Sequence, residues 1–268
     1  MVLKTRFISG GIGAVILVLV LISDKIFLNI GVALIASVAI IEMYRAVGLS
    51  KFKALNILVI AVSFGFTYAQ AFDGNLLMPV LYIFCAALFL LFMGHVEGVC
   101  FEHIAKAFFS AIFVSFFFGH LVFIRKLANG GYLIWLVFII SFLTDTFAYL
   151  VGKFFGKHKL APVLSPKKTI EGSVGGFLGA VIGTAVFGLV LERFYAVSFN
   201  YANALIIAVI CSVISQFGDL AASSVKRQYN IKDNGHIMPG HGGIMDRFDG
   251  VAFTAPAVYY LLMILPVI

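Results

Sequence analysis

The residues best suited to chemistry lie in one polar stretch, 219–249, of a largely apolar chain. The stretch contains four aspartates, and three of them are the candidates for metal binding: Asp219, Asp246 and Asp249. Asp246 and Asp249 are three residues apart and share a face if the last helix begins there. Carboxylate oxygens, completed by substrate phosphates, are the ligands that Mg²⁺ prefers. We therefore predict that these three aspartates are metal ligands. The basic residues among them suit metal-assisted phosphoryl or nucleotidyl transfer; they are Lys226, Arg227, Lys232 and Arg247.

The spacing of polar residues extends this stretch into the preceding apolar segment. On a helix, Ser215, Asp219, Ser223 and Lys226 recur at intervals of four, four and three, so they share one face. A polar stripe on a lipid-like helix must face other protein or a water-filled cavity. An interhelical hydrogen-bond seam also has polar residues but needs no ionised aspartate followed by lysine. The pattern therefore favours a functional site.

Two loop segments are predicted to bind anions. Glycines around His241, from Gly240 to Gly243, let backbone amides approach an anion closely, while the sequence offers His241 no partner for a zinc site. In the connection 152–171, Lys167 and Lys168 lie between hydroxyl residues that can donate to phosphate. This connection is not a P-loop, because the Gly-x4-Gly-Lys-Ser/Thr pattern is absent from it. Pro166 makes a helix improbable there.

Two other acidic residues lie within or beside apolar segments, where a carboxylate is costly. Asp145 is a candidate site residue, and Gly152 and Gly156 beyond it indicate either close helix approach or backbone against a ligand. Glu42 lies near a helix end beside Arg45, where snorkelling and a local ion pair explain it. Glu42 is therefore the weakest functional candidate among the acidic residues of the apolar segments. A further ridge is interpreted as helix packing; it consists of Gly175, Gly179 and Gly183.

The elements that must position these residues are membrane helices. Hydrophobic residues make up 62% of the 268, charged residues 12%, and the mean hydropathy is +1.08. Soluble domains carry about 25% charged residues, so lipid must cover much of this chain. We predict an all-α integral membrane protein forming one polytopic domain, 1–268. Its nine expected spans are 7–23, 27–44, 55–72, 76–94, 104–124, 131–151, 172–191, 201–222 and 250–267.

Basic residues predict the orientation of these spans. With the N-terminus inside, 15 of the 19 Lys and Arg residues fall on the inner face. The outer face then holds Lys25, Arg125, Lys126 and Arg193. Nine of the inner residues lie in the connections 152–171 and 223–249, a clustering that topology alone does not require. Such a surface attracts anionic headgroups or nucleotides.

At this point the sequence resembles the phosphatidate cytidylyltransferases, also called CDP-diacylglycerol synthases. Residues 223–249 match the family signature nearly throughout, including Lys-Arg, Lys-Asp, His-Gly-Gly and Asp-Arg-apolar-Asp. The single departure is Met238, where another apolar residue is usual. The segments 145–149 and 165–172 also look like family segments, so the resemblance covers roughly residues 140–260.

The resemblance implies that CTP and phosphatidate give CDP-diacylglycerol and pyrophosphate in phospholipid biosynthesis. It implies Mg²⁺ as cofactor, with a second cation left open. The expected location is the inner membrane of a bacterial-type cell, with the active site facing the cytoplasm. Membrane lipid is an expected partner, nucleic acid is not, and a homo-oligomer is left open.

Chemistry then suggests roles for individual residues. Phosphatidate is already largely a dianion at neutral pH, because the second pKa of a phosphate monoester is about 6, so no strong general base is needed. The residues assigned to catalysis are Asp219, Asp246, Lys226 and Arg247. The residues assigned to substrate binding are Asp145, Lys167, Lys168, Ser223, Arg227, Lys232, Asp233, His241, Gly242 and Gly243. Asp249→Asn should weaken activity less than Asp219→Asn or Asp246→Asn.

Three alternative functions fit the sequence less well. A transporter of an anionic solute would use the same basic cavity, but the two related halves typical of transporters are not visible in the sequence. A CDP-alcohol phosphotransferase would require Asp-Gly-x2-Ala-Arg, whereas Asp249-Gly250 is followed by Val-Ala-Phe-Thr. A non-enzymatic scaffold would not need Asp219 inside an apolar segment.

Overall fold

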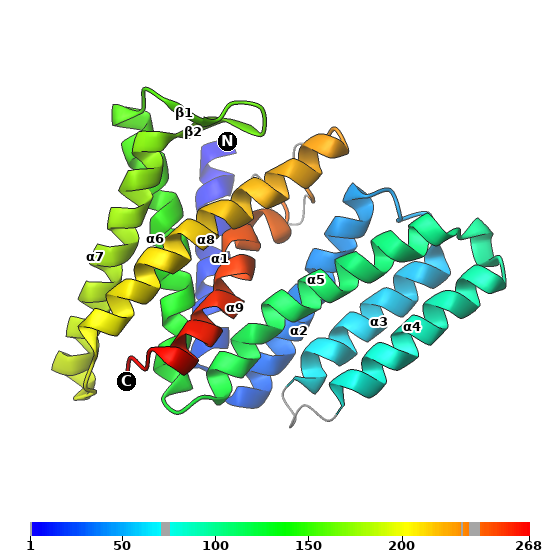
Figure 1. Cartoon of the computed structure of the whole chain (residues 1–268), viewed down its shortest axis with the longest axis horizontal. Helices are drawn as coiled ribbons and strands as arrows, with labels where there is room; N and C mark the ends of the chain where they lie inside the picture. The colour runs from blue at the N-terminus through cyan, green and yellow to red at the C-terminus, as the bar shows by residue number, and fades with distance from the viewer. Residues whose placement is uncertain (1, 71–75, 232, 236–241) are drawn as a thin grey trace. The chain divides into compact units, whose positions relative to one another are not determined.

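The computed structural model describes residues 2–70, 76–231, 233–235 and 242–268, and in these residues the chain is almost entirely helical (Figure 1). They form nine α-helices, one short 3-10 helix and two strands. The helices belong to two compact units, which are described separately. The first unit comprises residues 1–126 and 229–247, and the second comprises 127–228 and 248–268.

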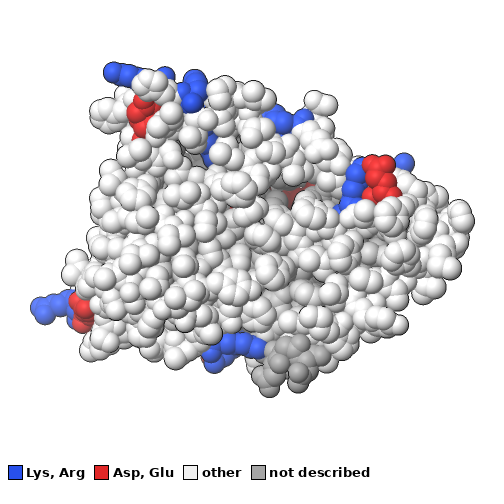
Figure 2. Space-filling view, viewed as in Figure 1, with Lys and Arg blue, Asp and Glu red and all other residues white. Residues whose placement is uncertain are grey.

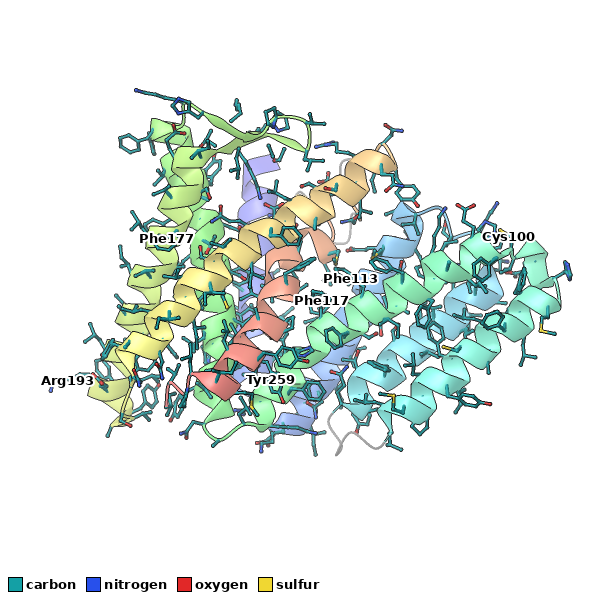
Figure 3. The ribbon with its side chains drawn as sticks, in the orientation of Figure 1. Cys100, Phe113, Phe117, Phe177, Arg193 and Tyr259 are labelled. Atoms are coloured by element: carbon teal, nitrogen blue, oxygen red, sulfur yellow. The ribbon has the colours of Figure 1, made fainter. Side chains whose placement is uncertain are left out.

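The first unit is a helical bundle. Its helices are α1 (Val2–Ile22), α2 (Lys25–Ala46), α3 (Lys53–Ala69), α4 (Leu77–Met93), η1 (Val96–Gly98) and α5 (Phe101–Lys126). Helix α2 packs against α3 and α5, and α3 also packs against α4. Large apolar side chains fill these contacts, including Leu28, Ile40, Leu55, Phe84 and Phe118, all fully buried. Phe113 and Phe117, one turn apart on α5, contact each other with ring centroids 4.5 Å apart (Figure 3).

The second unit contains α6 (Gly130–Phe155), the strands β1 (Lys159–Ala161) and β2 (Ser165–Thr169), α7 (Ile170–Tyr195) and α8 (Tyr201–Gln228). Helix α9 (Met245–Ile264) begins in the first unit and continues in the second. Helices α6 and α7 lie side by side (Figure 1). This contact uses the ridge predicted for packing. A Cβ added at Gly175, Gly179 or Gly183 would lie 2.0–2.5 Å from a side chain of α6, which confirms the packing interpretation.

The connection between α6 and α7 corrects the all-α prediction, because it contains a two-stranded antiparallel sheet. Lys159 pairs with Thr169 across the strands. Thr169 then caps α7, its hydroxyl accepting from the Gly172 amide at 3.1 Å. A Cβ added at Gly152 or Gly156 would lie within 2.9 Å of Thr169. Between the two interpretations left open for these glycines, the structure favours close packing.

The helices identify a multi-pass membrane protein. Five of those described are long and apolar enough to cross a membrane: α2, α5, α6, α7 and α8. Four apolar residues recur every four positions along α7: Val174, Leu178, Ile182 and Val186. Each side chain is at least half exposed, as lipid-facing side chains would be. In the second unit, Figure 2 shows charged groups near the β1–β2 hairpin and at the opposite end, with uncharged surface between. Helices occupy all nine predicted ranges; the nine crossings and the cytoplasmic N-terminus stay predictions.

Candidate functional site

The polar face predicted for residues 215–226 exists, because α8 continues to Gln228 and includes all four residues of the stripe. Hydroxyl groups join this face to its neighbours within the second unit. Ser215 donates to Ser141 of α6 at 3.3 Å, and Ser141 donates to Thr254 of α9 at 2.9 Å. These buried bonds hold α6, α8 and α9 together beside the acidic residues.

Aspartates from all three helices approach one another here. Asp249 of α9 is buried, with 6% exposed, and accepts from the Gly250 amide at 2.8 Å. It lies within electrostatic range of Asp219, Asp145 and Lys226. A Cβ at Gly250 would be 2.6 Å from the Ser215 hydroxyl and 3.8 Å from Asp145 Oδ2. The absence of a side chain at Gly250 therefore lets α9 lie close to Ser215 and Asp145. Of the three aspartates, only Asp249 is buried; Asp219 is partly exposed and Asp145 is exposed. A buried carboxylate beside two others requires nearby cations, because isolated buried charge is costly.

Lysines supply part of that positive charge. Lys168 Nζ lies 2.5 Å from Asp219 Oδ2, and each side chain is about one quarter exposed. Ser223 Oγ lies 3.5 Å from the other oxygen of Asp219, at the limit of a hydrogen bond. Lys167, the preceding residue on β2, is exposed. Of the two lysines predicted to bind phosphate, Lys168 therefore contacts the aspartate cluster, while Lys167 faces solvent.

The β1–β2 hairpin is fixed to α7 and α8 by other polar contacts. Glu171 accepts from the backbone amides of Lys157 at 3.0 Å and His158 at 3.2 Å, and its carboxylate lies 2.6 Å from His158 Nδ1. Arg227 Nε donates to the Leu164 carbonyl at 3.3 Å. Glu171 was noted in the sequence as part of a family segment but assigned no role. Its contacts identify it as the residue that holds this loop.

Basic residues of the second unit concentrate at one end. Seven of its eight lie on the hairpin, the adjoining end of α6 or the last turn of α8. The eighth, Arg193, lies at the far end of α7 (Figure 3). There, Glu192 accepts from the Tyr201 hydroxyl at 2.8 Å. The positive charge of the second unit is therefore concentrated at the end that carries the aspartate cluster.

The remaining predicted residues belong to the first unit. Asp246 accepts from the Asn234 amide at 2.8 Å, the Gly243 amide at 3.0 Å and Asn234 Nδ2 at 3.0 Å. Gly242 has a φ of +83°, a left-handed conformation that favours glycine, and a Cβ there would approach Asp233 and Asp246. Arg247 is exposed. Lys232, His241 and Gly240, also predicted to act here, lie outside the described residues.

The environment of Glu42 differs from the snorkelling position expected from the sequence. Its side chain is fully buried in the first unit instead of reaching toward solvent. Its carboxylate accepts from the backbone amides of Ile244 at 3.0 Å and Met245 at 2.9 Å. The signal available in the sequence was the cost of a carboxylate in an apolar segment, but nothing there identified a partner 202 residues away.

The donor chemistry of the site suits a hard cation. Asp219 and Asp249 offer carboxylate oxygens within one unit, and Mg²⁺ is commonly held by one or two carboxylates plus substrate phosphates. Among the residues that the structure describes, no group of three or more His, Cys, Asp or Glu is arranged to hold a metal. Asp246 already receives three hydrogen bonds in its loop. The three-aspartate ligand set therefore stays a prediction, and Asp219 with Asp249 is the part that the second unit brings together.

Comparison with known proteins gives consistent matches. Residues 4–265 match the model of a family described as the cytidylyltransferase family. The chain is 32% identical over 267 residues to the phosphatidate cytidylyltransferase of Bacillus subtilis, covering 97% of each chain. It is 44% identical over 147 residues to a Staphylococcus aureus protein of the same name, and 41% identical over 145 residues to one from Staphylococcus haemolyticus. The staphylococcal matches cover 54% of each chain.

Proposed function

Because this chain belongs to the cytidylyltransferase family, we propose that it transfers CMP from CTP to phosphatidate, giving CDP-diacylglycerol and pyrophosphate. The observation that carries the proposal is the aspartate and lysine cluster of the second unit. Asp219 lies against Lys168, and the buried Asp249 lies near both Asp219 and Lys226. This arrangement suits a reaction between two polyanions, because it offers fixed positive charge and carboxylate ligands side by side.

The transfer needs positioning and charge compensation more than proton removal. A phosphate oxygen of phosphatidate forms a bond to the α-phosphorus of CTP while the bond from that phosphorus to the bridging oxygen breaks. The electron pair of the broken bond leaves on pyrophosphate. Phosphatidate is a sufficient nucleophile as the dianion that predominates above a pKa of about 6. A strong general base is therefore unnecessary.

Each charged residue of the cluster then has a distinct role. Lys168 and Lys226 bind phosphate oxygens and balance the charge that accumulates on the leaving pyrophosphate. Asp219 and Asp249 would hold Mg²⁺, which would supply additional positive charge at the triphosphate. Arg247, which belongs to the first unit, would also bind phosphate oxygens of CTP. The other predicted phosphate-binding residues are Lys167, Arg227, Lys232 and His241.

We further propose that the reaction takes place at the cytoplasmic face of the inner membrane. The polarised charge of the second unit supports this orientation, since basic residues are enriched on the cytoplasmic side. Seven of its eight Lys and Arg residues lie at the end that carries Asp219 and Lys168. The lipid phosphate would reach this end from the inner leaflet while its acyl chains stay among the apolar helices.

A purified preparation in detergent tests the proposal. CTP labelled in its cytosine, together with Mg²⁺ and phosphatidate, should transfer label to the lipid phase only when phosphatidate is present. The alternative, transport of an anionic solute, predicts a different result. Protein in sealed vesicles would then accumulate labelled anion without forming labelled lipid. That result would overturn the proposed function.

A further inference from the structure

Glu42 contacts the start of a helix that lies far from it in the sequence. It lies in the last turns of α2, and its side chain is 0% exposed. One carboxylate oxygen accepts from the Ile244 amide at 3.0 Å and the other accepts from the Met245 amide at 2.9 Å. Helix α9 begins at Met245, so these amides are among the first of that helix.

This contact replaces a helix cap that the local sequence does not supply. The first amides of a helix have no acceptor within the helix, and a side-chain oxygen of the preceding residue usually accepts from one of them. Ile244 stands at that position and has no side-chain oxygen. Glu42 supplies both oxygens from another helix. Its negative charge also suits the positive end of the helix dipole and strengthens both hydrogen bonds.

The surrounding glycines are adapted to the contact. A Cβ added at Gly235 or Gly243 would lie 2.4 Å from a carboxylate oxygen of Glu42. Any larger residue at either position would push the carboxylate away. On its other side, the same short segment is held by Asp246, which accepts from the Gly243 and Asn234 amides. Two carboxylates therefore fix the backbone that leads into α9.

We propose that Glu42 is a positioning residue, which holds residues 243–247 so that Asp246 and Arg247 keep the orientation needed for CTP. The proposal rests on the proposed function, and it assigns to Glu42 no contact with substrate. It explains why a carboxylate is retained within an apolar helix despite the cost of burying it. An ion pair at a helix end would instead leave the side chain partly exposed.

The test compares Glu42→Gln and Glu42→Asp with wild type in detergent. Gln keeps the shape but offers one acceptor, and its amide group opposes a backbone donor. Asp keeps both acceptors and the charge but is shorter by one methylene. Glu102→Gln is the matched control, because Glu102 is an exposed acid in the same unit that pairs with Lys106. The measurements are kcat, the KM for each substrate, the thermal unfolding midpoint and amide hydrogen exchange of residues 243–247.

A shift of the reacting groups by about 1 Å can cost roughly 100-fold in rate, so Glu42→Gln should lower kcat per folded molecule by about 10- to 100-fold. The KM for phosphatidate should stay near that of wild type. Exchange at residues 243–247 should accelerate, Glu42→Asp should recover part of the rate, and Glu102→Gln should match wild type. A residue needed only for folding would instead reduce the folded yield and leave kcat unchanged.

The two proposals fail in different ways. If wild type forms CDP-diacylglycerol and Glu42→Gln has wild-type kcat and exchange, the positioning role is wrong while the proposed function stands. If wild type forms no CDP-diacylglycerol, the proposed function is wrong. The exchange measurement then still tests the contact between Glu42 and α9, because it requires no activity. Unchanged exchange in both Glu42 variants would overturn the contact itself.

Discussion

Replacing Lys168 by methionine tests whether the contact with Asp219 matters for catalysis. Methionine keeps most of the side-chain length and removes the charge. Lys168 Nζ lies 2.5 Å from Asp219 Oδ2, and both side chains are only about one quarter exposed. Lys159 is the matched control, because it lies on the neighbouring strand β1, is exposed and has no assigned role in substrate binding. The two variants therefore make the same side-chain change at a partly buried and at an exposed lysine of one hairpin.

The expected loss follows from the strength of a charged contact. A hydrogen bond to a charged partner contributes about 1.5–3 kcal/mol, and each 1.4 kcal/mol corresponds to roughly tenfold. Lys168→Met should therefore lower kcat/KM for CTP by about 10- to 100-fold. Lys159→Met should stay within about threefold of wild type, as expected for an exposed charge.

The assay is the initial rate at which label passes from CTP into lipid, measured at several CTP concentrations in detergent. Thermal unfolding of each variant shows whether the protein remains folded. Equal losses for the two lysine variants would show that the contact between Lys168 and Asp219 has no special role, because they would indicate a general effect of positive charge. A wild-type rate for Lys168→Met would show the same more directly. Recovery of activity in Lys168→Arg would support a requirement for charge at this position.

Other changes separate catalysis from packing. Asp219→Asn should lower kcat by at least about 100-fold and Asp249→Asn by less, since metal ligation contributes several kcal/mol; equal losses would contradict this ranking. Gly176→Ala should destabilise the fold by about 1–3 kcal/mol through overpacking, because its Cβ would lie 2.6 Å from the Thr144 carbonyl oxygen. Gly183→Ala should cost less, since its nearest neighbour is the end of a flexible side chain; thermal unfolding of both would show whether the order is reversed. Chelation of divalent cations should abolish labelling and Mg²⁺ should restore it; full activity after chelation would refute the metal requirement.

The positions of the helices were largely predictable from the sequence. Long apolar segments require backbone hydrogen bonds within the segment, so the nine predicted ranges match helices to within a few residues. The polar stripe containing Asp219 was also predictable, because four residues at helical spacing share a face. Helix α8 extends six residues beyond the apolar segment that was predicted to end at residue 222. Hydropathy detects the apolar part of a helix and not its polar continuation.

The contacts between residues that lie far apart in the sequence were not predictable. The β1–β2 hairpin is short and contains Pro166, which indicated only that a helix was disfavoured. Thr169 packs against Gly152 and Gly156, and Glu171 accepts from the Lys157 amide, so the hairpin is held by contacts with residues earlier in the chain. Glu42 shows the same limit more clearly, because its partners are the Ile244 and Met245 amides. Composition and spacing reveal that a buried carboxylate needs a partner, but they do not identify which backbone amides provide it.

In the proposed reaction, the bond between the α- and β-phosphates of CTP breaks and the α-phosphate passes to the lipid. Parallel reactions with CTP labelled at the α-phosphate or at the γ-phosphate test it directly. Only the α-label should enter the lipid phase, while the γ-label should be recovered in pyrophosphate. The α-label should stay in the aqueous phase with Asp219→Asn protein that unfolds at the wild-type temperature. Appearance of the γ-label in lipid, or of neither label with folded wild-type protein, would contradict the account.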